Sequence, residues 1–222
     1  MSIMAALAQG GRTVLMGNLD AVDAAWNQIS EYEYGAADWA MENRVENAMP
    51  TALNDAGLAQ LWITAEGGVC QREVFSTCQD VHSGIAHIES VSTKGALEQS
   101  QVLLADSQCI AQIAYGPKQV EREVRVQGYF VCEDGDRSSA VEEREGALSL
   151  RSERMYEGVE NLYAWFPILD NEDLVERCRA LLCQEPVRRE ETSLSVVMDM
   201  PERRVDWAVS GAQWQTVWLK SP

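Results

Sequence analysis

The chain has 222 residues, of which 46% are hydrophobic and 24% are charged. This composition and length indicate a globular protein with a sizeable buried core and exclude a disordered chain. No apolar run is long enough for a transmembrane helix, and the net charge of −17 argues against nucleic acid or an anionic membrane as partner, because both are polyanions. The N-terminal stretch lacks the basic start and apolar core of an export signal, so we predict a cytoplasmic protein.

The first fifty residues are predicted to form a helical layer. Asn18 is a residue type that caps helices, and Pro50 would end the second of two helices. Apolar residues recur at helical spacing in two runs: Leu19, Val22, Trp26 and Ile29, then Trp39, Met41, Val45 and Met49.

Residues 58–169 are predicted to form a β meander. Short apolar runs separated by turn residues favour strands within 58–64, 69–78, 84–93, 147–156 and 161–169, whereas 95–106 fits helix and strand equally. The polar stretch 133–146 reads as a loop. Its Asp134-Gly135-Asp136 run is similar to a calcium loop but lacks the glycine and the ligand spacing that such a loop needs.

A hairpin within residues 108–132 is the clearest element of this meander. Folding it at 116–119 places Ala111 opposite Val124 and Gln112 opposite Glu123, with apolar residues on one face and polar residues on the other. We therefore expect Val124 to be buried and Glu123 to be exposed. Ile110 on the polar face is one exception to the pattern.

Two further elements follow. Apolar residues at helical spacing predict a helix over 171–183, and alternation predicts a three-stranded meander over 191–219. The pairs predicted in this meander are Leu194 with Val209, Val196 with Trp207, Met198 with Val205, and Trp207 with Trp214.

Together these elements predict an α+β fold in a single domain over 1–222. Its main part is an antiparallel β meander that forms a curled sheet or a barrel, with an N-terminal helical layer over 1–50 and one late helix. The sequence shows no internal repeat and no linker that would divide it.

Metal binding is a weak hypothesis for this chain. Cys70, Cys78, His82 and His87 lie within eighteen residues and are side chains that zinc prefers, but their spacing lacks the close cysteine pair of a zinc hairpin. The alternative is ordinary core cysteines and surface histidines. We predict free buried thiols, no cofactor and no catalytic residue, since no nucleophile motif such as G-x-S-x-G is present.

Two arginines occupy positions that otherwise read as apolar. Arg122 and Arg154 could point into a closed barrel, close to Tyr115, Trp207 and Trp214. Guanidinium groups with aromatic walls would suit a small amphipathic anion such as a fatty acid or a pigment that carries propionates. The alternative is that both arginines reach solvent from the rim of the sheet.

These observations give two hypotheses of different class. Residues 1–116 hold 14 acidic against 4 basic side chains, which favours a non-enzymatic interaction protein that binds a basic protein partner. The alternative is a β-barrel carrier of a small amphipathic anion, or a lyase- or isomerase-like protein that holds its substrate in such a cavity.

Overall fold

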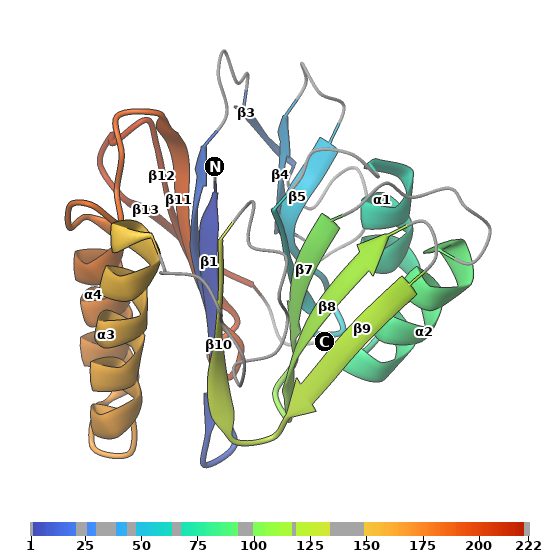
Figure 1. The fold of residues 1–222 in the computed structure, drawn as a ribbon, viewed down its shortest axis with the longest axis horizontal. Coiled ribbons are helices and arrows are strands. Elements are labelled where there is room, and N and C mark those ends of the chain that lie inside the picture. Colours follow the sequence, from blue (N-terminus) through green and yellow to red (C-terminus); the bar gives the residue numbers. More distant parts are fainter. Residues whose placement is uncertain are drawn as a thin grey trace.

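The computed structural model describes residues 2–20, 26–29, 39–43, 48–63, 68–92, 100–116, 119–133 and 149–219. Two antiparallel sheets pack face to face, and a pair of helices covers the outer face of each sheet, so the molecule has four layers (Figure 1). The prediction of an α+β fold with mainly antiparallel strands is confirmed. Both sheets are open in the described part of the chain, so the barrel option is wrong.

The first sheet has six strands, and helices α3 (Leu150–Trp165) and α4 (Asn171–Leu182) cover its outer face. In spatial order the strands are β10 (Gly128–Glu133), β1 (Ile3–Gln9), β2 (Arg12–Asp20), β11 (Thr192–Asp199), β12 (Arg204–Val209) and β13 (Gln215–Trp218).

The second sheet has seven strands, and helices α1 (Gly68–Thr77) and α2 (Val81–Ser92) cover its outer face. Its strands follow the chain order: β3 (Trp26–Ile29), β4 (Trp39–Asn43), β5 (Ala48–Leu53), β6 (Ala59–Trp62), β7 (Ser100–Ala105), β8 (Ile110–Gly116) and β9 (Gln119–Arg125). None of the described helices is long and apolar enough to cross a membrane.

Three apolar layers lie between these four layers of secondary structure. One fills the space between the sheets, and one lies under each helix pair. The inner strands are therefore buried on both faces. In β1, for example, Met4 faces the second sheet while its neighbour Ile3 faces α3 and α4, and both are fully buried.

This burial on both faces explains why the predicted N-terminal helical layer is wrong. The described parts of residues 1–50 are strands β1 to β4 and the start of β5, which contains Pro50. A strand that is buried on both faces loses period-two alternation, and its continuous apolar run can match a helical spacing by chance. Val22 and Val45, which supported the two helices, lie outside the described residues.

Three helices replace strands predicted from short apolar runs. Residues 69–78 and 84–93 fall mostly in α1 and α2, and 147–156 and 161–169 fall mostly in α3. Only the run at 58–64 contains a strand, β6, and the ambiguous stretch 95–106 contains β7. Short apolar runs do not distinguish a strand from a helix that buries one face.

The hairpin register is confirmed, but the exposure assigned to its faces is not. Ala111 pairs with Val124 and Gln112 pairs with Glu123, as predicted. However, Val124 is 38% exposed and Gln112 only 5% exposed. Val124 is exposed because β9 is the edge strand of the second sheet. Gln112 is buried because its face of β8 packs toward the first sheet, and Ile110 is buried on that same face.

The C-terminal predictions were more accurate. Helix α4 begins one residue after its cap Asp170 and buries the five apolar residues expected, and the predicted pairs between β11 and β12 are all present. The third strand starts later than predicted, so Trp207 pairs with Gln215 and not with Trp214.

A buried carboxylate ends β11. Asp199 is 1% exposed, and one of its oxygens has no hydrogen-bond partner among the described residues. Burial raises the pKa of Asp199 to about 6, although the main-chain N–H of Glu202 and the Arg12 guanidinium favour the charged form. Because the pKa of an unfolded Asp is about 3.9, the folded state holds this proton more tightly, and stability falls as pH rises from about 4 to 6.

Asp199→Asn should therefore stabilise the protein at neutral pH but not at acid pH. We expect the gain in free energy of unfolding to be near zero at about pH 4 and on the order of 1–3 kcal/mol at about pH 7. Denaturant unfolding of both proteins at a series of pH values measures this, with Asp55→Asn at an exposed turn as the control. A gain that does not vary with pH would contradict the assigned cause.

Candidate functional site

The five residues of the predicted anion site are not brought together. They are Tyr115, Arg122, Arg154, Trp207 and Trp214. Tyr115 packs against Trp62 beneath α1 and α2, and Trp207 packs between the sheets. Arg122 extends from edge strand β9 to an ion pair with Glu89 of α2, while Arg154 and Trp214 belong to the outer side of the first sheet.

The four metal candidates also separate. Cys70 of α1 and Cys78 directly after that helix are buried in the core beneath the helices, and burial raises the pKa of the Cys70 thiol to about 12 and so disfavours the thiolate that binds metals. Nε2 of His87 in α2 lies 2.9 Å from the Glu73 carboxylate, and His82 is exposed. Across the described ranges no group of three or more potential metal ligands is present.

Buried polar and charged side chains gather at the N-terminal end of β1. This strand lies inside the first sheet, between β10 and β2, and Figure 1 shows its N-terminal end near the middle of the four layers. The side chains that gather there come from five segments that are distant in sequence: Ser2, Asn18, Asp20, Glu133, Arg151 and Thr192.

Ser2 stands directly before β1 and is 4% exposed. Its Oγ accepts a hydrogen bond of 3.1 Å from the main-chain N–H of Asp20, at the end of β2. Since Ile3 faces the helices, alternation along the strand puts position 2 on the face of Met4, which is directed toward the second sheet. The hydroxyl is thus held at the end of a central strand, at the interface of the two sheets.

Asp20 forms a buried ion pair with Arg151 in the first turn of α3. The guanidinium donates to both carboxylate oxygens, at 2.6 and 3.2 Å, and the two side chains are 4% and 0% exposed. Thr192 Oγ donates to Asp20 at 2.9 Å, and Arg151 Nε donates to the carbonyl of Val187 at 2.9 Å. Both charges are therefore compensated, as a buried pair requires.

Asn18 fixes the segment that follows α4. Its Nδ2 donates to the carbonyls of Leu182 and Val187, at 2.9 and 3.1 Å, and its Oδ1 accepts from Ser195 Oγ at 2.7 Å. A side-chain amide with all these partners is rigid, so the chain around Val187 is held against the end of β2.

A second buried carboxylate lies on the opposite side of β1. Glu133, at the end of β10, pairs in register with Ile3 and accepts hydrogen bonds from the hydroxyls of Ser149 and Ser152. The guanidinium of Arg189 lies 3.6 Å from it. The strand end that carries Ser2 is thus flanked by two carboxylates, each with an arginine beside it.

Sequence reasoning missed this site. It searched for nucleophile motifs, and Ser2, Asp20 and Arg151 belong to no such motif. One available signal was a serine placed directly before a strand; another was an arginine near the start of an apolar run, which the structure shows to be fully buried. Ser2 and its partner Asp20 are 18 positions apart, and Arg151 and Asp20 are 131 positions apart, so neither pair could be identified from one sequence.

No protein-family model matches this sequence, and no curated protein sequence matches it. Solved structures do share its fold. The penicillin V acylase of Agrobacterium tumefaciens is 8% identical, with a TM-score of 0.57 over 98% of this chain and 85% of the acylase. The Caenorhabditis elegans ortholog of N-acylethanolamine-hydrolyzing acid amidase is 13% identical, with a TM-score of 0.61 over 90% of this chain and 92% of the amidase.

A conjugated bile acid hydrolase from Clostridium perfringens is 10% identical, with a TM-score of 0.59 over 98% of this chain and 92% of the hydrolase. At these identities the likeness shows the fold. The prediction of a non-enzymatic interaction protein is wrong, because these structures match nearly the whole chain and each carries the name of an enzyme. The open sheets also overturn the barrel carrier.

The buried ion pair should be essential for the fold around Ser2. Arg151→Met would leave the Asp20 carboxylate buried without its cation, which typically costs about 3–5 kcal/mol of stability. Arg154→Met, on the same helix, removes an exposed pair with Glu157 and should cost less than about 1 kcal/mol.

Denaturant unfolding of the two variants measures this difference. Adding Asp20→Asn to Arg151→Met removes the uncompensated charge and should restore part of the loss. Equal effects of Arg151→Met and Arg154→Met would show that the buried pair is not needed for stability.

Proposed function

We propose that this protein is an amide hydrolase in which cleavage of the peptide bond before Ser2 makes that serine the nucleophile. The observation that carries the proposal is the position of Ser2 Oγ, held by the Asp20 N–H at the end of a central strand and beside the buried Asp20–Arg151 pair. Three similar folds, which carry the names acylase, amidase and hydrolase, support this reaction class.

The need for a base supports cleavage before Ser2. A serine hydroxyl is a weak nucleophile and needs a group that takes its proton. Both histidines of the chain lie in α2, on the far side of the second sheet from β1 (Figure 1). The α-amino group of Ser2, once released, belongs to the same residue as Oγ, and its ordinary pKa of about 7.7–8.0 suits a base near neutral pH.

The proposed reaction has two halves. Ser2 Oγ attacks the amide carbon, its proton passes to the α-amino group and then to the departing amine, and an acyl ester on Ser2 remains. Water, deprotonated by the same α-amino group, then attacks the ester and releases the carboxylic acid and the free serine. Asp20 and Arg151 act as positioning residues, because Asp20 holds Oγ through its main-chain N–H.

One of the similar structures supports the choice of position. The conjugated bile acid hydrolase was solved as a variant in which the cysteine at the second position of its chain is replaced by alanine. Cysteine and serine both present a nucleophilic atom on the β-carbon. This chain likewise carries a residue of this kind, Ser2, at its second position.

Ser2→Ala should abolish hydrolysis without unfolding the protein. With p-nitroanilides of phenylacetic and lauric acid as substrates, we expect kcat to fall by at least about 10³-fold, because no acyl ester can form. Intact-mass spectrometry should show Ser2 as the first residue of the active protein, and an added acyl group after rapid quenching. Ser76→Ala, at an exposed serine of α1, is the matched control and should leave the rate unchanged.

The pH profile tests the base. In the active protein kcat/KM should rise with pH and level off near pH 8, as the α-amino group loses its proton. Full activity in protein whose Ser2 is still preceded by another residue, or in Ser2→Ala, would overturn the proposal.

A further inference from the structure

The outer surface of α3 and α4 differs from an ordinary solvated helix face. Of six large hydrophobic side chains that are exposed in the described residues, three lie on α3 or in the turn after it: Leu150 at 70%, Trp165 at 53% and Ile168 at 71%. Trp165 and Ile168 lie three residues apart at the C-terminal end of α3, whereas Leu150 is at the opposite end of the helix. Large exposed apolar side chains such as Trp165 and Ile168 are a feature of interaction surfaces.

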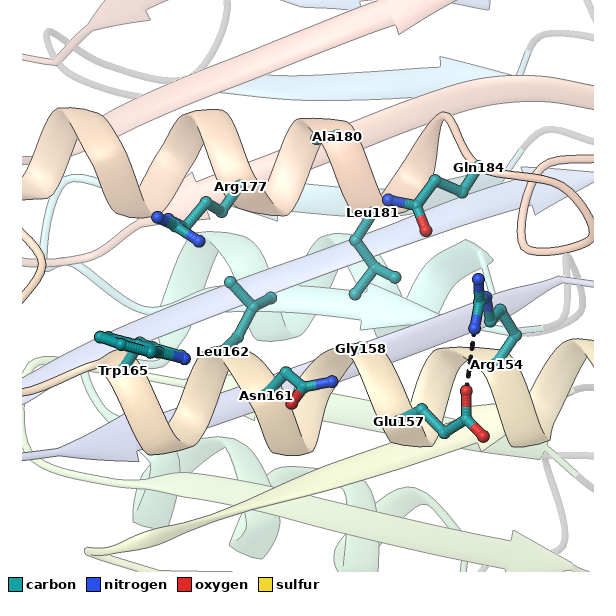
Figure 2. A pocket seen from close by; sticks show the side chains of 10 residues that line it. All are labelled: Arg154, Glu157, Gly158, Asn161, Leu162, Trp165, Arg177, Ala180, Leu181 and Gln184. Carbon is teal, nitrogen blue, oxygen red and sulfur yellow. Dashed lines mark hydrogen bonds and ion pairs between the residues drawn. The ribbon is translucent and has the colours of Figure 1, made fainter.

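A groove of about 480 Å³ runs between the two helices, and Trp165 is part of its lining. Figure 2 shows Leu162 of α3 and Leu181 of α4 projecting toward each other in it, with Trp165 and Arg177 at one end and Arg154 and Gln184 at the other. Gly158 faces Leu181 so closely that a Cβ there would lie 2.3 Å from the leucine. The same surface therefore offers projecting apolar side chains and a hollow with an apolar floor.

The charge of the groove is opposite to that of the chain as a whole. Its lining carries Arg154 and Arg177 against Glu157, whereas the chain has 18 basic and 35 acidic residues. Arg154 is paired with Glu157 at 3.0 Å, while Arg177 has no ion pair with any residue that the structure describes. The groove thus suits an acidic surface, and exposed Glu153, Glu160 and Glu176 lie on the same two helices outside its lining.

We infer that a second copy of this chain occupies the groove, in a symmetric dimer formed by α3 and α4. In a two-fold dimer the same surface of both copies forms the contact, so that surface must be complementary to itself. A residue that contacts a second residue in the other copy is matched by the reverse contact. This surface carries both the groove and side chains that would fill it. In the dimer, Trp165 and Ile168 would enter the groove of the other copy, and Arg177 would pair with the glutamates of the other copy. Trp and Arg are also the residues that most often dominate such interfaces.

The test is the oligomeric state of the full-length protein, measured by sedimentation velocity over a concentration series up to about 1 mM. We expect a dimer whose dissociation constant rises at least tenfold in Trp165→Glu and in Arg177→Glu. Val126→Glu, at a 73% exposed apolar residue between β9 and β10, is the matched control and should leave the dimer unchanged. Circular dichroism and thermal unfolding confirm that each variant is folded, which is expected because the side chains changed are exposed.

Two results would overturn the inference. One is a monomer throughout the concentration series, including a monomer that native mass spectrometry shows with a small molecule bound. The other is a dimer that persists unchanged in both Trp165→Glu and Arg177→Glu, which would place the interface elsewhere. Neither result bears on hydrolysis by Ser2, because the groove lies on the outer side of the helices and shares no residue with that site.

Discussion

The buried ion pair between Arg151 and Asp20 connects three parts of the molecule that depend on one another. Arg151 begins the helical layer, Asp20 ends β2, and the carbonyl of Val187 belongs to the segment after α4. Removing two charges from water is costly, and the pair is tolerated because two guanidinium bonds, Thr192 and a carbonyl satisfy it. The same pair fixes the Asp20 N–H that holds Ser2, so the fold and the proposed chemistry rest on one interaction.

The four-layer arrangement places this site where a reactive group can be held rigidly. A central strand with both faces buried has little freedom, and its N-terminal end lies at the interface of the two sheets. Loops of many lengths can be attached around such an end without disturbing the core. This suits a fold that is shared by proteins of 8–13% identity with different named substrates.

Helix α3 shows how one element can serve two surfaces. Its inner side carries Arg151 and the apolar residues Met155, Val159 and Leu162, which pack on the first sheet. Its outer side carries Leu150 and Trp165, which have no counterpart in the core of the same chain. The rest of that side is polar, with exposed Glu153, Glu157 and Glu160, as is usual for an amphipathic helix, and the proposed dimer would cover the exposed Trp165.

The sequence by itself determined the elements in which apolar and polar residues keep a regular period. The registers of β8 with β9 and of β11 with β12, and helix α4 with its five buried apolar residues, follow from period two and period 3.6 alone. Strands β1, β2 and β5, whose apolar residues run on without alternation, lack that signal. Helices α1 to α3 were confused with strands because short apolar runs fit both. The site around Ser2 was decided only by the tertiary structure, because burial and partners separated by more than a hundred residues are properties of the folded chain and not of any local pattern.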